Sequence, residues 1–97
     1  MRPEVSSEIN DVAKTLDGIE QVMDPERLAE RVRELEETAA DPELWDDPPH
    51  AQQVTTELSA TQAKLRRLKE LRQRVDDLPV IADLAEEEGE PETFTEE

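Results

Sequence analysis

The sequence contains no cysteine, which excludes disulfide bonds and thiolate metal sites. Its single histidine, His50, cannot build a transition-metal site, because such sites usually need two or more His or Cys ligands. The sequence also lacks the glycine-rich loops that cradle phosphates and the G-x-S-x-G motif of an activated serine. The sequence therefore shows no sign of a nucleophilic catalytic triad. We expect no catalytic residue, no cofactor and no metal in this chain.

Aromatic residues and glycine are also scarce, with one Trp, one Phe, no Tyr and two Gly. A core without aromatic residues has to be built from Leu, Val, Ile and Ala, which suits packed helices better than a sandwich or a barrel. No apolar run approaches the roughly 18 residues of a membrane span. Residues 1–7 lack the apolar core of a signal peptide. We therefore expect a cytoplasmic protein that does not contact a membrane.

Acidic side chains dominate the sequence, and the net charge is −16. This charge disfavours nonspecific binding to nucleic acids or to anionic membranes. More than half of the positive charge lies in residues 64–74, which hold six basic side chains and one acidic side chain. We name the six bases the basic stretch: Lys64, Arg66, Arg67, Lys69, Arg72 and Arg74.

The basic stretch is the best local candidate for a partner contact, and two interpretations stay open. In the first, its cations pair within the molecule, with acidic residues of earlier helices and through Glu70 and Arg74 at i,i+4. In the second, they contact RNA phosphates or an acidic protein surface. No aromatic residue interleaves the bases, so stacking on nucleobases is not indicated.

The apolar residues recur at steps of three and four, which is the spacing of one face of a helix. This spacing predicts a first helix that ends near Met23, because Pro25 removes a backbone donor and crowds the preceding turn. A second helix should start there, with Asp24 as N-cap and Pro25 as its first residue. Its apolar stripe runs out near Ala40.

A short turn should follow the second helix, capped by Asp41 and carrying Leu44 and Trp45. We interpret Trp45 as a structural anchor, a core plug between the second helix and the third. The alternative is an exposed anchor for a partner, because Trp is enriched at interface hot spots.

The longest helix is expected over residues 48–77, because prolines tolerate a helix start and Pro79 should end the helix. A short separate helix over the apolar residues 80–85 should follow. We expect a domain over residues 1–90 and a solvated tail over residues 91–97. The predicted fold is all-α: an antiparallel helical hairpin or bundle of three to four helices with one long helix.

An ordered set of residue blocks runs through residues 3–90: Pro3-Glu4-Val5, Leu35-Glu36-Glu37, Asp41-Pro42-Glu43-Leu44-Trp45-Asp46-Asp47, Ala51-Gln52-Gln53-Val54-Thr55, Glu57-Leu58-Ser59, Leu65-Arg66-Arg67, Glu70-Leu71-Arg72, Arg74-Val75-Asp76-Asp77-Leu78 and Leu84-Ala85-Glu86-Glu87-Glu88. This set resembles the amino-terminal region of the bacterial peptide chain release factor 2 family. The Asp-Pro-x-Leu-Trp-Asp-Asp block is its most specific part.

The resemblance implies a translation termination factor, whose family recognises UGA and UAA stop codons and promotes peptidyl-tRNA hydrolysis on the ribosome. The family's codon-reading Ser-Pro-Phe and catalytic Gly-Gly-Gln tripeptides do not occur in this sequence, so no such residue is carried over. The matching part is the helical first domain. It implies partners at the large-subunit stalk base, namely ribosomal protein L11, the GTPase that recycles release factors, and rRNA phosphates at the basic stretch.

The family continues its helical domain beyond the matching part, so we expect apolar surface to be open in this chain. We expect Val80, Ile81, Leu84 or Phe94 to be partly open or used in self-association. The alternative function is a stand-alone acidic coiled-coil adaptor or regulatory protein. A reading frame that continues into Gly-Gly-Gln would favour the release factor, and a genuine stop after Glu97 would favour the adaptor.

Overall fold

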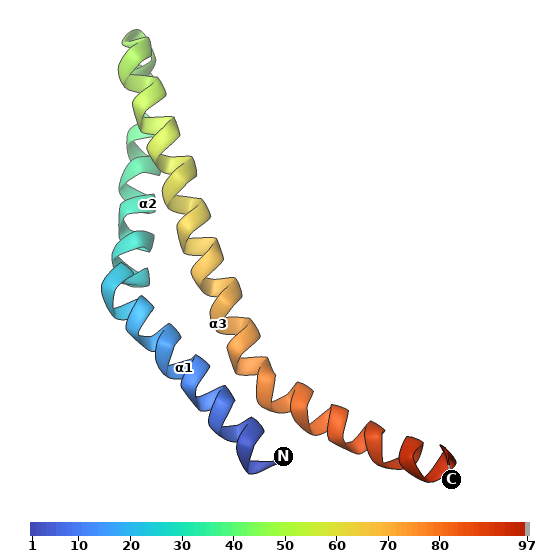
Figure 1. Ribbon diagram of the computed structural model, residues 1–97. Coiled ribbons are helices and arrows are strands. Elements are labelled where there is room, and N and C mark those ends of the chain that lie inside the picture. Colours follow the sequence, from blue (N-terminus) through green and yellow to red (C-terminus); the bar gives the residue numbers. More distant parts are fainter. Residues whose placement is uncertain (97) are drawn as a thin grey trace. The chain divides into compact units, whose positions relative to one another are not determined.

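The computed structural model describes the backbone of residues 1–96 and the side chains of residues 1–88, and its elements are all helical (Figure 1). No strand occurs within residues 1–96. The prediction of an all-α fold with one long helix is confirmed. The helices are α1 (Pro3–Met23), α2 (Pro25–Ala39), the short 3-10 helix η1 (Pro42–Asp46) and α3 (Pro48–Glu96).

The contacts divide the chain into two compact units, each built from paired helices. Unit 1 consists of Met1–Ile19 and Leu71–Glu97, so it pairs most of α1 with the later part of α3. Unit 2 is Glu20–Glu70, in which η1 reverses the chain and the first part of α3 runs back along α2 (Figure 1). Unit 2 is therefore an antiparallel helical hairpin.

The start of α2 is where the sequence predicts it. Asp24 is the N-cap, and its carboxylate accepts a hydrogen bond of 3.3 Å from the backbone N–H of Arg27. Pro25 occupies the first turn, where its missing N–H costs nothing. Asp24 has φ 51°, in the left-handed region that Asp and Asn tolerate better than most residues. This single residue makes the break between α1 and α2.

The turn between α2 and α3 is held by two further aspartate caps. The carboxylate of Asp41 accepts a hydrogen bond of 3.0 Å from the backbone N–H of Glu43, which starts η1. The carboxylate of Asp47 accepts a hydrogen bond of 3.4 Å from the backbone N–H of His50 in the first turn of α3. The prediction of a capped short turn at this place is confirmed.

The apolar core of unit 2 lies close to this turn. One residue from η1 fills the space between α2 and α3, where side chains of both helices meet it. The buried members of the cluster are Leu35, Leu44, Ala51 and Val54, with Ala39 and Leu58 packed against them. In unit 1, the buried apolar side chains among the described residues are Leu16 and Val75.

The prediction that a helix ends at residue 77 and a separate helix follows is wrong. α3 runs through Pro79 to Glu96 as one uninterrupted helix (Figure 1). Proline removes the N–H that would bond the carbonyl of Val75, but its fixed φ of about −65° is helical. Contacts within unit 1 on both sides of Pro79 offset the local cost of about 3 kcal/mol, since Val75 is buried and Asp83 and Glu86 bind the amino group of Met1. The backbone of residues 91–96, expected in a tail, belongs to α3.

Candidate functional site

Trp45 lies on the surface, with 56% of its area exposed, so its interpretation as a buried core plug is wrong. Its neighbour Leu44 takes the interior position instead, at 6% exposure. In a 3-10 helix successive side chains point about 120° apart, so two neighbours cannot both face the same core. The indole N–H of Trp45 still donates a hydrogen bond of 3.2 Å to the carbonyl of Ala39 at the end of α2.

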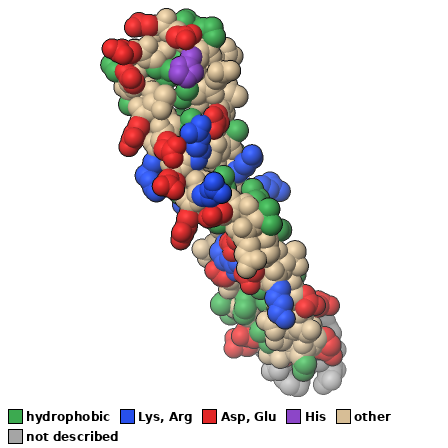
Figure 2. Space-filling view, turned by 90° about the vertical axis from the view of Figure 1, so that its left-hand side faces the viewer, with side chains coloured by type: hydrophobic (Ala, Val, Ile, Leu, Met, Phe, Trp, Pro, Cys, Tyr) green, Lys and Arg blue, Asp and Glu red, His purple; other side chains and the backbone are tan. Residues whose placement is uncertain are grey.

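Trp45 lies in an acidic part of the chain. We define the hairpin tip as residues 36–47, the end of α2 and the turn into α3. The hairpin tip holds six acidic residues and no Lys or Arg. Figure 2 shows acidic side chains gathered over this end of unit 2, with no Lys or Arg over it on the face drawn. The structure therefore presents one large aromatic side chain in a strongly negative setting.

The basic stretch divides into a paired residue and several unpaired ones. In unit 1, Arg72 contacts Asp17 of α1 at 2.6 Å and Asp76 of α3 at 3.7 Å. The intramolecular interpretation therefore holds for Arg72. Among the described side chains, no ion pair joins Glu70 to Arg74. The bases with no ion pair to any described side chain are Lys64, Arg66, Arg67, Lys69 and Arg74.

An ion pair between α2 and α3 in unit 2 was not found by sequence reasoning. Arg31 holds Glu57 with two parallel hydrogen bonds, of 2.8 Å from Nε and 3.0 Å from a terminal nitrogen. These bonds lower the pKa of the Glu57 carboxyl below its usual value. Arg31 also bonds Glu34 at 3.2 Å, one turn along α2. Arg31 and Glu57 lie 26 positions apart in the sequence, so only the register of the hairpin could have revealed this pair.

The α-amino group of Met1 makes a second link between helices, within unit 1. It lies 2.7 Å from a carboxylate oxygen of Glu86 and 3.4 Å from one of Asp83. The hydrogen bond to Glu86 raises the pKa of the amino group. The same bond lowers the pKa of the Glu86 carboxyl. Acids of α3 therefore hold the start of α1.

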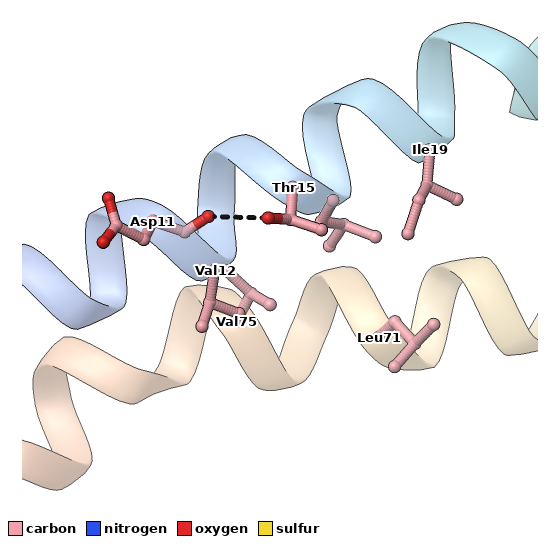
Figure 3. Close-up of a pocket in the computed structure, with 7 residues that line it drawn as sticks. Asp11, Val12, Thr15, Ile19, Leu71 and Val75 are labelled. Carbon is pink, nitrogen blue, oxygen red and sulfur yellow. Dashed lines mark hydrogen bonds between the residues drawn. The ribbon is translucent and has the colours of Figure 1, made fainter.

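Unit 1 has an apolar groove of about 300 Å³ between α1 and α3 (Figure 3). Side chains of both helices point into it, and Val12 and Ile19 are 47% and 40% exposed. The hydroxyl of Thr15 donates to the carbonyl of Asp11 at 3.0 Å, so its proton is already bonded within α1. The lining residues are Asp11, Val12, Thr15, Leu16, Ile19, Leu71 and Val75.

The expectation of open apolar surface on the later part of α3 is confirmed. Val80, Ile81 and Leu84 are each more than half exposed. Phe94, the fourth residue of that expectation, lies outside the residues whose side chains are described. In the described part of the chain, no three His, Asp or Glu side chains gather as a metal site would require. None of the helices there has the length and apolar character needed to cross a bilayer.

The PCRF domain family matches residues 28–97 of the chain. Peptide chain release factor 2 of Corynebacterium aurimucosum is 62% identical over 90 residues, covering 93% of this chain and 24% of that protein. The Corynebacterium glutamicum protein of that name is 56% identical over 97 residues, covering 100% of this chain and 26% of that protein. The Saccharopolyspora erythraea protein of that name is 49% identical over 90 residues, covering 93% of this chain and 24% of that protein. No solved structure matches the chain.

The chain thus spans about a quarter of the length of the curated relatives it matches. Its resemblance to bacterial peptide chain release factor 2 is confirmed by identities that cover nearly all of its residues. The family match takes in α3, η1 and most of α2, which is well over half of the sequence. The chain therefore belongs to the PCRF domain family.

Proposed function

We propose that this chain is the helical interaction domain of a translation termination factor, and that it works on the ribosome in the cytoplasm. One observation carries the proposal. A protein named peptide chain release factor 2 is 56% identical to this chain over 97 residues, which is the whole length of this chain. Recognition of UGA and UAA codons and hydrolysis of peptidyl-tRNA would belong to the other three quarters of such a factor. The role of this domain would be contact.

The contact would lie at the stalk base of the large subunit, with ribosomal protein L11 and with the GTPase that recycles release factors. The unpaired part of the basic stretch supports a contact with rRNA phosphates. In unit 2 this part consists of Lys64, Arg66, Arg67 and Lys69, which lie within two turns of α3. Unpaired cations release counterions from phosphates when they bind, so they add affinity that salt weakens.

Binding to purified bacterial large ribosomal subunits tests the proposal. We expect saturable binding. The logarithm of the binding constant should fall linearly with the logarithm of the salt concentration. Neutralising four bases of the basic stretch to Gln (K64Q/R66Q/R67Q/K69Q) should weaken binding and flatten that slope. A control neutralises Arg27 and Arg33 of α2, which lie outside the stretch, and the loss of binding is compared per charge removed.

The outcomes separate the two parts of the proposal. Absence of binding by the unaltered chain at low salt would overturn the role on the ribosome. Binding that is unchanged by the four substitutions at low salt would keep that role and remove the basic stretch from it. An equal loss per removed charge in the control variant would show that only the overall charge matters.

A further inference from the structure

We propose that the hairpin tip docks through Trp45 on a basic protein surface of the ribosome that offers an apolar pocket for the indole. This inference rests on the proposed function, because it names the kind of surface that would receive one end of unit 2. It concerns a different part of the chain from the basic stretch.

The exposure of Trp45 is the first observation. More than half of its surface faces solvent, although the chain has few large apolar side chains to spare for its core. Trp is the residue most enriched at interface hot spots, where one side chain fills a pocket and loses its water. An exposed Trp that the fold does not need for burial is therefore available for a partner.

The second observation is that the indole is held in place before any partner arrives. Its N–H is bonded to the carbonyl of Ala39, and the adjacent Leu44 is locked in the core of unit 2. The cap from Asp41 fixes the start of the same short helix. A side chain that is already ordered loses little conformational entropy on binding, so more of its contact energy becomes affinity.

The negative charge of the hairpin tip indicates which kind of partner it can bind. Asp41 and Asp47 are used as helix caps. The other four acids of the hairpin tip are exposed, and their carboxylates make no hydrogen bond or ion pair with a described side chain: Glu36, Glu37, Glu43 and Asp46. No Lys or Arg occurs between residues 33 and 64. This surface repels RNA phosphates and the acidic surface of a second copy, and it complements a basic protein surface.

Substitution of Trp45 tests the docking directly. A fluorophore on Ser7→Cys, in a chain with no other cysteine, reports binding to purified large ribosomal subunits from outside unit 2. We expect Trp45→Ala to weaken binding by about tenfold or more, as for a hot-spot residue. Trp45→Phe should weaken it less. The control Val22→Ala removes another exposed apolar side chain of unit 2, one that is 86% exposed, and should leave binding unchanged.

Neutralising three of these four acids gives a test whose result differs between a basic protein partner and RNA. The variant E37Q/E43Q/D46N should bind large subunits more weakly, and the difference should shrink as salt is raised. Tighter binding of this variant, to subunits or to free ribosomal RNA, would mean that the tip faces RNA and would overturn the inference.

The remaining outcomes are also decisive. If the unaltered chain binds and Trp45→Ala binds equally well, the inference is overturned and the proposed function stands. If Trp45→Ala changes only the self-association of the chain, a second copy is the occupant and the inference is again overturned. If the unaltered chain does not bind large subunits at all, both proposals are contradicted. Circular dichroism on each variant confirms that the helices remain formed.

Discussion

Leu44 and Trp45 are adjacent residues with opposite tasks. Leu44 is 6% exposed and joins the core that closes the hairpin of unit 2, whereas Trp45 is 56% exposed. We therefore expect the larger side chain to contribute less to stability than the smaller one.

Truncation of each side chain should show this separation. Leu44→Ala removes buried methyl groups and leaves a cavity, so we expect a loss of about 2–4 kcal/mol in the free energy of unfolding. Trp45→Ala should cost clearly less, because most of its surface is already in water. Urea unfolding followed by circular dichroism measures both. A Trp45→Ala variant that is destabilised as much as Leu44→Ala would contradict the assignment of the core.

The Arg31–Glu57 pair predicts a pH dependence. Because Arg31 lowers the pKa of the Glu57 carboxyl in the folded chain, the pair stabilises the fold above the carboxyl's unfolded pKa. That stability is lost as the pH falls through the folded pKa. Both side chains are about half exposed, so the effect should be small and weakened by salt.

A carboxyl titration followed by nuclear magnetic resonance checks this. We expect Glu57 to titrate at lower pH than it does in the Arg31→Met variant. Equal titration in both chains would show that the bidentate pair does not persist in solution. Arg33→Met is the matched control, because it removes an exposed Arg of the same helix that has no ion pair with a described side chain.

At the scale of elements, α3 is the longest helix and has a weak point at Pro79. Pro79 lies inside the helix, where it cannot donate to the carbonyl of Val75. Val75 is buried, and Leu78 and Pro79 are partly buried. The helix therefore persists through Pro79 at a local cost.

Removing that cost should stabilise the chain. Pro79→Ala restores one backbone hydrogen bond and a better helix former, so we expect the free energy of unfolding to rise by about 1–3 kcal/mol. Ala82→Pro, which adds a second proline three positions further along α3, should destabilise the helix. Thermal unfolding of the three chains measures the difference. A Pro79→Ala variant that is no more stable than the unaltered chain would contradict a continuous α3.

Local signals predicted most of these elements. The Asp-Pro pairs at residues 24–25 and 41–42 fix helix starts through their own caps, so the sequence alone was sufficient. The end expected at Pro79 was wrong, because the contacts that α3 makes on both sides of Pro79 offset one missing donor. The exposure of Trp45 could not be read from apolar spacing, since either Leu44 or Trp45 satisfies the pattern. The Arg31–Glu57 pair depends on hairpin register, which no local motif encodes.

At the scale of the molecule, acidic charge and open apolar surface occur together in unit 1. This unit holds fourteen acidic and four basic side chains by sequence. Val80, Ile81 and Leu84 are exposed on the same stretch of α3. Like charges oppose the association that these apolar side chains favour, so salt should control the balance.

We therefore expect weak self-association that grows with salt concentration. Screening reduces the repulsion between acidic surfaces, and apolar contact remains. Ile81→Gln with Leu84→Gln should abolish the association, while Val22→Gln, at an exposed apolar residue of unit 2, should not. Sedimentation over a series of protein and salt concentrations measures it. A strictly monomeric chain at high salt would contradict the prediction.

The central claim is that this chain serves a translation termination factor. The most direct measurement replaces the matching quarter of Corynebacterium glutamicum peptide chain release factor 2 with this chain and measures stop-codon-dependent peptide release on ribosomes. The account predicts release close to that of the unaltered factor, and weaker release when the inserted chain carries Trp45→Ala. A folded chimera that binds stop-codon ribosomes no better than a factor lacking the segment, and releases no more peptide, would contradict the account.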